Sequence, residues 1–107
     1  MDDARALCRE AFQHFANDRL DEAVAGYRRC VELAPDLALA WNGLSMALAR
    51  AGDLDGAVEA AQRLVALEPD DPLSHTNLSR LYQQKGMIPE AEREAARASQ
   101  LSMRPSG

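Results

Sequence analysis

A period of 34 residues runs through this sequence. When the chain is shifted by that distance, Pro35 falls on Pro69, and one column is always alanine, at Ala23, Ala57 and Ala91. Self-similarity at a period of about 20 to 50 residues is typical of repeat proteins, in which each repeat is one supersecondary unit. We therefore divide the chain into three units, over about residues 4–37, 38–71 and 72–105.

Each unit is predicted to contain two helices joined by a tight turn. The 20 Ala and 14 Leu residues, with only five aromatic residues, favour helices over a β-sandwich. Gly52, Gly86 and Asp18 share the turn column, where a left-handed residue ends a helix. Asp71 followed by Pro72 is typical of a helix N-cap and first helical position. The expected helices span residues 3–16, 20–34, 37–51, 54–68, 72–85 and 89–102.

Small residues recur at one position of each expected helix. The first helix of each unit carries Ala11, Ser45 or Ser79, and the second carries Ala23, Ala57 or Ala91. Small side chains at both positions allow two helices to approach closely, with larger residues filling the surrounding volume. The larger residues expected in the core are Trp41, Leu44, Leu48, Leu64, Leu78 and Tyr82.

These columns resemble the tetratricopeptide repeat family, whose pattern is W-x2-LG-x2-Y…A-x3-F…P. The second unit has Trp41-x2-Leu44-Ser45-x2-Leu48…Ala57-x3-Ala61…Pro69. The third has His75-x2-Leu78-Ser79-x2-Tyr82…Ala91-x3-Ala95, and the first has Leu7-x2-Glu10-Ala11-x2-His14…Ala23-x3-Tyr27…Pro35. Glu10, His14 and Met103 depart from the pattern. The resemblance implies an all-α fold, a right-handed α-solenoid of three helix-turn-helix units in a single domain over residues 1–107.

The last expected helix has lost the large aliphatic residues of its predecessor. Column by column, Val58 becomes Glu92, Leu64 becomes Ala98 and Val65 becomes Ser99. Terminal units of a solenoid need a polar outer face because no further unit covers them. We therefore expect three units to be the complete fold. The alternative is a fragment of a longer array.

The resemblance also implies a binding surface. In the family, the first helix of each unit lines a concave wall that usually holds an extended peptide or a helix. The family's groove columns give Arg5, Arg9, Phe12, Leu39, Asn42, Met46, Arg50, Leu73, Asn77, Arg80 and Gln84 here. The columns that grip a C-terminal carboxylate in some co-chaperones hold Cys8, Phe12, Gly43, Leu73 and Asn77. Only Asn77 suits that role, so this clamp is absent.

Charge and polarity vary along the expected wall. The three wall helices (2–16, 37–51 and 72–86) sum to +2, and the rest of the chain carries −7. Phe12 and Met46 favour apolar groups of a ligand, while Asn77 and Arg80 favour a carboxylate or backbone acceptors. The alternatives are that Phe12 and Phe15 fill space between helices and that the arginines are ordinary solvated side chains.

Several function classes are disfavoured by composition. A net charge of −5 with a single Lys argues against nucleic acid as the partner. No apolar run approaches the ~20 residues of a membrane span, and the acidic start is unlike a signal peptide. Two cysteines indicate reduced thiols in a cytoplasmic protein, Cys30 buried and Cys8 open to modification. The 11 Arg to one Lys are typical of GC-rich bacterial genomes.

Catalytic and cofactor chemistry also lack a sequence basis. His14 and His75 lie in different units, which argues against a metal site, and His75 occupies the column of Trp41. No Gly-rich phosphate loop, HExxH or GxSxG is present, so we expect neither a cofactor nor an enzyme. The leading hypothesis is a non-catalytic adaptor or chaperone-like module that binds a peptide or helix of another protein. The alternative is a homo-oligomer, in which end faces, the groove or a loose tail over 101–105 dock on a neighbouring copy.

Overall fold

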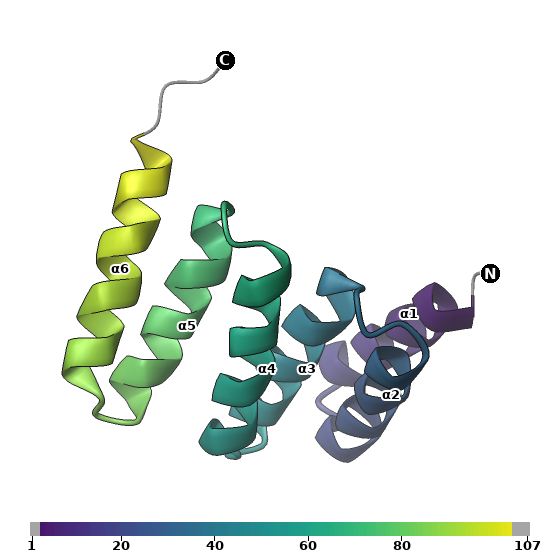
Figure 1. Ribbon diagram of the computed structural model, residues 1–107. Coiled ribbons are helices and arrows are strands. Elements are labelled where there is room, and N and C mark those ends of the chain that lie inside the picture. The colour runs from purple at the N-terminus through teal and green to yellow at the C-terminus, as the bar shows by residue number, and fades with distance from the viewer. Residues whose placement is uncertain (1–2, 104–107) are drawn as a thin grey trace.

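The computed structural model describes residues 3–103, which form six helices and no strand. The helices are α1 (Asp3–Ala16), α2 (Leu20–Leu33), α3 (Ala38–Arg50), α4 (Leu54–Leu67), α5 (Pro72–Gln84) and α6 (Ile88–Ser102). Every bound lies within one residue of its expected position, so the predicted all-α architecture is confirmed. The helices form three hairpins stacked in chain order, with α1 and α6 at opposite ends of the molecule (Figure 1).

The turn inside each hairpin depends on one left-handed residue, as predicted. Asp18 has φ 62°, Gly52 has φ 93° and Gly86 has φ 78°. This conformation costs a residue with a side chain more than glycine, although Asp tolerates it better than most. Asp71 accepts a hydrogen bond from the Leu73 N–H at 3.0 Å, so it caps the start of α5 as expected.

The two helices of each hairpin meet at their small residues. The Ser45 hydroxyl donates to the Ala57 carbonyl at 3.0 Å, and the Ser79 hydroxyl donates to the Ala91 carbonyl at 2.7 Å. In the first hairpin, a Cβ added at Gly26 would lie 2.9 Å from the Ala11 Cβ. The predicted columns therefore meet in the second and third hairpins, where a serine adds a hydrogen bond to the contact, while in the first hairpin Ala11 lies against Gly26.

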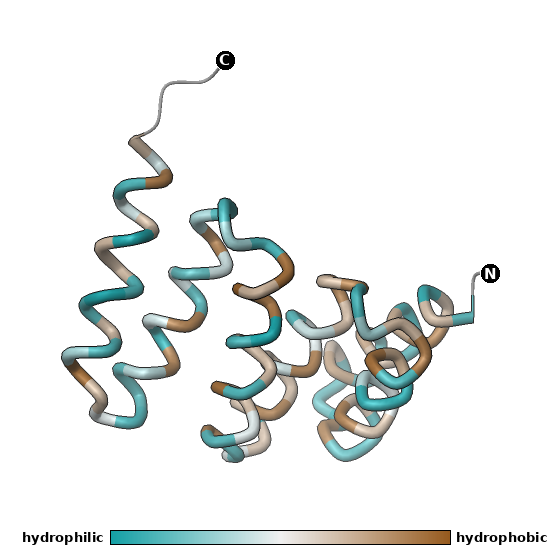
Figure 2. The backbone as a smooth tube through the Cα atoms, in the orientation of Figure 1, coloured by the Kyte–Doolittle hydropathy of each residue, from teal (hydrophilic) through white to brown (hydrophobic). Residues whose placement is uncertain are grey.

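One buried core continues from hairpin to hairpin, because α2 packs on α3 and α4 packs on α5. Hydrophobic and hydrophilic residues alternate along the helices, as expected where one face is buried (Figure 2). Trp41 Nε1 donates to the Pro35 carbonyl at 2.7 Å, and His75 Nε2 lies 2.7 Å from the Pro69 carbonyl. The repeat position shared by Trp41 and His75 thus contacts the segment before its own hairpin in both the second and the third unit, through an indole in one and an imidazole in the other.

The expectation of a loose tail over 101–105 is wrong for its first residues. Leu101 and Ser102 belong to α6, and Leu101 is buried. Met103 follows the helix and is exposed, while 104 and 105 lie outside the described residues. No helix within residues 3–103 has the length and apolar character needed to cross a membrane.

Candidate functional site

Three adjoining hollows open on the surface formed mainly by α1, α3 and α5, which we call the first-helix wall. The apolar hollow, of about 470 Å³, includes Phe12, Tyr27 and Met46 in its lining. The polar hollow, of about 220 Å³, includes Arg50, Asn77 and Arg80. The third hollow, of about 310 Å³, is lined by Leu73 among others. Asn42 lines all three.

The structure brings most of the predicted groove residues together around these hollows. Ten of the eleven line at least one of them: Arg9, Phe12, Leu39, Asn42, Met46, Arg50, Leu73, Asn77, Arg80 and Gln84. Arg5 lines none of the three, although it is exposed on α1. The wall is thus a contiguous hollowed surface built from three helices that are far apart in the sequence.

The apolar hollow has exposed side chains at its rim and a buried ring beneath them. Phe12 is 53% exposed and Leu39 is 54% exposed, whereas Tyr27 is only 3% exposed. A Cβ added at Gly43 would lie 2.2 Å from Tyr27 Cε1 and 2.3 Å from Tyr27 Cζ. The ring therefore fills the place where a side chain at position 43 would begin.

Sequence reasoning missed Tyr27 as a lining residue. Tyr27 lies in the A-x3-F column of the family pattern, and that column was not among those assigned to the groove. The missed signal is that Ala61 and Ala95 occupy this column in the other units, so a large ring at Tyr27 needs space from a neighbouring helix. Gly43 provides that space.

The two thiols are less accessible than expected. Cys8 lines the apolar hollow but is buried, which corrects the expectation that it is open to modification. Cys30 is fully buried, as predicted, and its thiol points at the Ala4 carbonyl at 3.4 Å. Burial, with a smaller effect of the Cys8 thiol, raises the pKa of Cys30 to about 12. Burial and the neighbouring thiols also raise the pKa of Tyr27. Cys30 is therefore held in its unreactive, protonated form.

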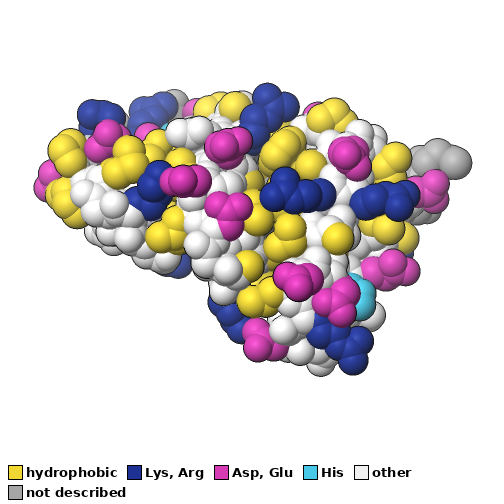
Figure 3. Space-filling model, turned by 90° about the horizontal axis from the view of Figure 1, so that it is seen from below, with side chains coloured by type: hydrophobic (Ala, Val, Ile, Leu, Met, Phe, Trp, Pro, Cys, Tyr) yellow, Lys and Arg dark blue, Asp and Glu magenta, His cyan; other side chains and the backbone are white. Residues whose placement is uncertain are grey.

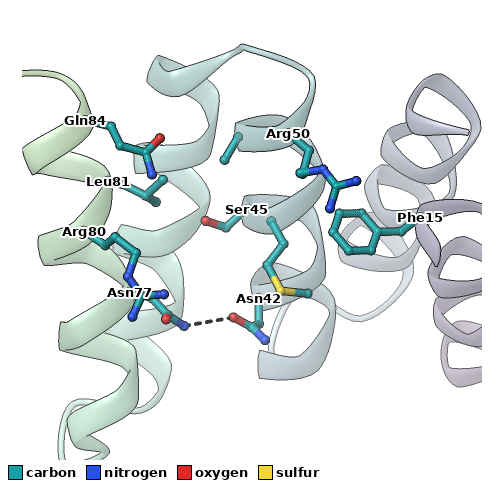
Figure 4. A pocket seen from close by; sticks show the side chains of 10 residues that line it. Phe15, Asn42, Ser45, Arg50, Asn77, Arg80, Leu81 and Gln84 are labelled. Carbon is teal, nitrogen blue, oxygen red and sulfur yellow. Dashed lines mark hydrogen bonds between the residues drawn. The ribbon is translucent and has the colours of Figure 1, made fainter. Parts of the chain in front are cut away.

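In the polar hollow, side chains from α3 and α5 contact each other directly. Asn77 Nδ2 donates to Asn42 Oδ1 at 3.2 Å, the dashed line in Figure 4. Arg80 and Gln84 extend from α5 beside this contact, opposite Phe15 of α1 (Figure 4). Within residues 3–103, the guanidinium of Arg80 has no hydrogen-bond or ion-pair partner.

Arg50 differs from Arg80 because its guanidinium already interacts with other side chains of the protein. Its Nη2 lies 3.2 Å from Asp18 Oδ1, and its guanidinium lies 5.1 Å from the centroid of the Phe15 ring. Phe15 is half-buried and packs against the core, as the alternative interpretation of this residue held. Arg80, rather than Arg50, is therefore the cation of the polar hollow that is free to meet a ligand.

Charge on the surface is more mixed than the net charges of the helices indicate. Lys85 pairs with Asp55 and Arg50 pairs with Asp18, so acidic residues outside the first helices offset two of the cations at this wall. In the space-filling view, cationic and anionic side chains lie next to one another among hydrophobic side chains (Figure 3). Recognition here would therefore rely on individual side chains more than on a broad positive field.

His75 is a buried structural residue. Its Nδ1 lies 2.8 Å from Glu94 Oε1, and its Nε2 faces the Pro69 carbonyl, so both ring nitrogens have partners. No group of three or more His, Cys, Asp or Glu side chains able to hold a metal ion occurs in residues 3–103. On the first-helix wall, by contrast, an unpaired cation, Arg80, and an exposed apolar side chain, Phe12, line adjoining hollows.

Comparison with known proteins finds one matching family model and several solved structures of similar fold. The tetratricopeptide repeat family model matches residues 14–76 and 48–101, whereas no curated protein matches the sequence. Among solved structures, MamA matches with a TM-score of 0.88 at 22% identity, over 92% of this chain and 58% of that chain. The CopN-Scc3 complex matches with a TM-score of 0.92 at 18% identity, over 98% of this chain and 62% of that chain. SycD, a type III secretion translocator chaperone of Yersinia enterocolitica, matches with a TM-score of 0.89 at 20% identity, over 98% and 80%.

At these identities the structural matches show the fold alone, and the chain spans about three fifths of the length of the first two neighbours. The family match covers most of the sequence and includes parts of all three hairpins. The repeated hairpins, their paired small residues and this match lead to the same result: the chain belongs to the tetratricopeptide repeat family.

Proposed function

We propose that this protein is a non-catalytic interaction module that holds a peptide or helical segment of a partner protein against the first-helix wall. The observation that carries the proposal is the junction of two unlike hollows at Asn42. One offers exposed apolar side chains such as Phe12, and the other offers the unpaired guanidinium of Arg80. A segment with an apolar side chain followed by a carboxylate or a backbone carbonyl complements both.

The fold of the neighbours supports this proposal. One neighbouring structure is a complex, CopN-Scc3, and another is a chaperone, SycD. We also propose a cytoplasmic location, which two buried, free thiols support because disulfides are rare in that compartment.

The test is selection of binding segments from a library of random peptides on the purified chain. Replacing Phe12 and Arg80 together with Ala should weaken the selected peptides by about tenfold or more, because exposed anchors of this kind carry most of the energy of an interface. Affinity is measured by isothermal titration calorimetry. The matched control replaces Leu33 and Arg28, two exposed residues of α2, with Ala and should leave the affinity for the peptides unchanged. Equal losses in both variants, or no loss from the wall variant, would refute the proposal.

Self-assembly into a homo-oligomer is the second candidate. Exposed apolar residues outside the wall, Leu33 (56%) and Ile88 (50%), are the surfaces that would support it. Light scattering over a wide range of protein concentration decides the question. A constant monomer mass eliminates this candidate and leaves the first-helix wall proposal unaffected.

A further inference from the structure

The apolar hollow contains a polar group without a partner. The Tyr27 hydroxyl makes no hydrogen bond with any residue in 3–103, although the residue is only 3% exposed. No side-chain nitrogen or oxygen in that part of the chain is both sealed from solvent and unpartnered. The hydroxyl must therefore reach solvent, and Tyr27 lines this hollow.

Gly43 explains how a buried ring presents its polar end. The atoms that an added Cβ at Gly43 would meet are Cε1, Cζ and Cδ1 of Tyr27, at 2.2, 2.3 and 2.7 Å. Cζ carries the hydroxyl, so the polar end of the ring lies against the backbone of α3 where that helix has no side chain. Because Tyr27 lines the hollow, this is the surface at which its hydroxyl can meet solvent. The lining around it is largely apolar, with Arg9, Gln13 and Asn42 as its other polar side chains.

We propose that this hollow takes a tryptophan or tyrosine side chain of the partner segment, whose indole N–H or phenol hydroxyl forms a hydrogen bond with the Tyr27 hydroxyl. This inference rests on the proposed function and names the anchor that the wall recognises. Phe12 and Met46 supply an aromatic face and a thioether, which both favour aromatic rings.

A purely apolar side chain fits this hollow less well. It would cover the Tyr27 hydroxyl and deprive it of water without offering a partner, which is unfavourable. A ring with a polar edge buries the same apolar area and replaces the lost water contact. A volume of about 470 Å³ is enough for such a ring and lies within the range of about 300–1,000 Å³ found for ligand sites.

The experiment titrates the ¹⁵N-labelled full chain with N-acetyl-tryptophanamide, N-acetyl-tyrosinamide and N-acetyl-phenylalaninamide. The amide signal of Gly43 and those of its neighbours should shift with all three. The tryptophan and tyrosine probes should bind about threefold to tenfold more tightly than the phenylalanine probe, the effect of one neutral hydrogen bond.

Tyr27→Phe should abolish this preference, and it should bind the phenylalanine probe at least as tightly as the unmodified chain, because the hydroxyl that this probe leaves without a partner is gone. The matched control is Tyr82→Phe, because the Tyr82 hydroxyl already accepts from Gln62 Nε2 at 2.9 Å and does not line the hollow. That variant should keep the preference. Phe12→Ala should weaken all three probes, which tests the apolar rim without touching the hydroxyl.

Three outcomes overturn the inference: no binding near Gly43, equal affinity for the three probes, or a preference that survives Tyr27→Phe. A different result separates it from the proposed function. If the probes show the expected preference but no library peptide binds the wall, the anchor site stands and the partner proposal fails. If peptides bind through Arg80 while the probes show no preference, the partner proposal stands and the anchor inference fails.

Discussion

Two contacts hold the hairpins together, one between the first and second hairpins and one between the second and third. They use equivalent positions of the repeat, but the position that carries the larger side chain differs. In the first contact, the large Tyr27 of α2 meets Gly43 of α3. At the positions 34 residues later, the small Ala61 of α4 corresponds to Tyr27, and Asn77 of α5 corresponds to Gly43. Asn77 then turns to Asn42 across the wall.

This exchange of sizes shows how a constant backbone yields different surfaces. Where the second helix supplies the bulk, the wall has an apolar hollow with one hydroxyl. In the second contact, the larger side chain comes from the first helix of the unit, and there the wall has amides and a guanidinium. Two columns of the repeat therefore decide the chemistry of the hollow without altering the hairpins themselves.

The largest expected effect comes from Tyr27→Ala, which removes the bulk of the first contact. Loss of a buried aromatic ring should lower the free energy of unfolding by about 3–5 kcal/mol, measured by urea unfolding followed by circular dichroism. Adding Gly43→Ala should restore part of the loss, since the new methyl group occupies space that the ring vacated. Strictly additive destabilisation would show that the two positions do not compensate for each other.

The second contact should depend more on hydrogen bonds than the first. His75→Ala leaves the Pro69 carbonyl and Glu94 without their partner, and we expect a loss of about 2–3 kcal/mol in the same unfolding assay. Trp41→Phe removes the exposed bond to the Pro35 carbonyl and keeps an aromatic ring beside Arg63 and the core, so the expected loss is smaller, about 1 kcal/mol. Equal losses of stability in His75→Ala and Trp41→Phe would show that the second contact does not depend more on hydrogen bonds than the first.

Alkaline pH should destabilise the first hairpin, in which the Cys30 thiol of α2 lies 3.4 Å from the Ala4 carbonyl of α1. The folded chain raises the pKa of Cys30 from an ordinary value near 9 to about 12. Above about pH 9 the unfolded chain loses this proton while the folded chain retains it, so stability falls as pH rises. The expected decline is at most about 1 kcal/mol per pH unit above pH 9, and it ends where the folded chain also loses the proton, near pH 12.

Urea unfolding at pH 8, 9 and 10 measures this slope. Cys30→Ala lowers stability at every pH but should show a shallower decline over this range. Identical slopes in the two proteins would mean that Cys30 ionisation is not the cause.

The smallest effect is expected from Asn77→Ala. Its hydrogen bond to Asn42 is half-buried and faces a hollow, so its loss should cost about 0.5–1 kcal/mol of stability. Arg80→Ala should change the urea midpoint hardly at all, because Arg80 has no partner within residues 3–103. A large loss from Asn77→Ala would show that the second contact needs this residue for packing.

The fold was predictable because its signals are local and repeated. The turn residues Asp18, Gly52 and Gly86 and the cap at Asp71 act within a few residues of chain, and three copies in register confirm one another. Small columns such as Ser45 and Ala57 meet because both belong to one hairpin.

The missed features of the site depend on contacts between hairpins. Arg50 is occupied by Asp18, which lies 32 residues away, and Tyr27 depends on the absence of a side chain at Gly43. Cys8 is buried although its column lines the wall, because depth below a surface depends on neighbouring rings. The resemblance to the family implied which residues line the wall, whereas their availability to a ligand depends on contacts that only the three-dimensional structure shows.

The position of Asn42 at the meeting point of the three hollows has a thermodynamic consequence. Its Oδ1 accepts from Asn77, so a ligand that turns the Asn42 side chain toward the apolar hollow frees the Asn77 amide on the polar side. Occupation of one hollow then alters the donors offered by the next. By linkage the coupling acts equally in both directions, which makes the order of apolar and polar groups along a bound segment part of its affinity.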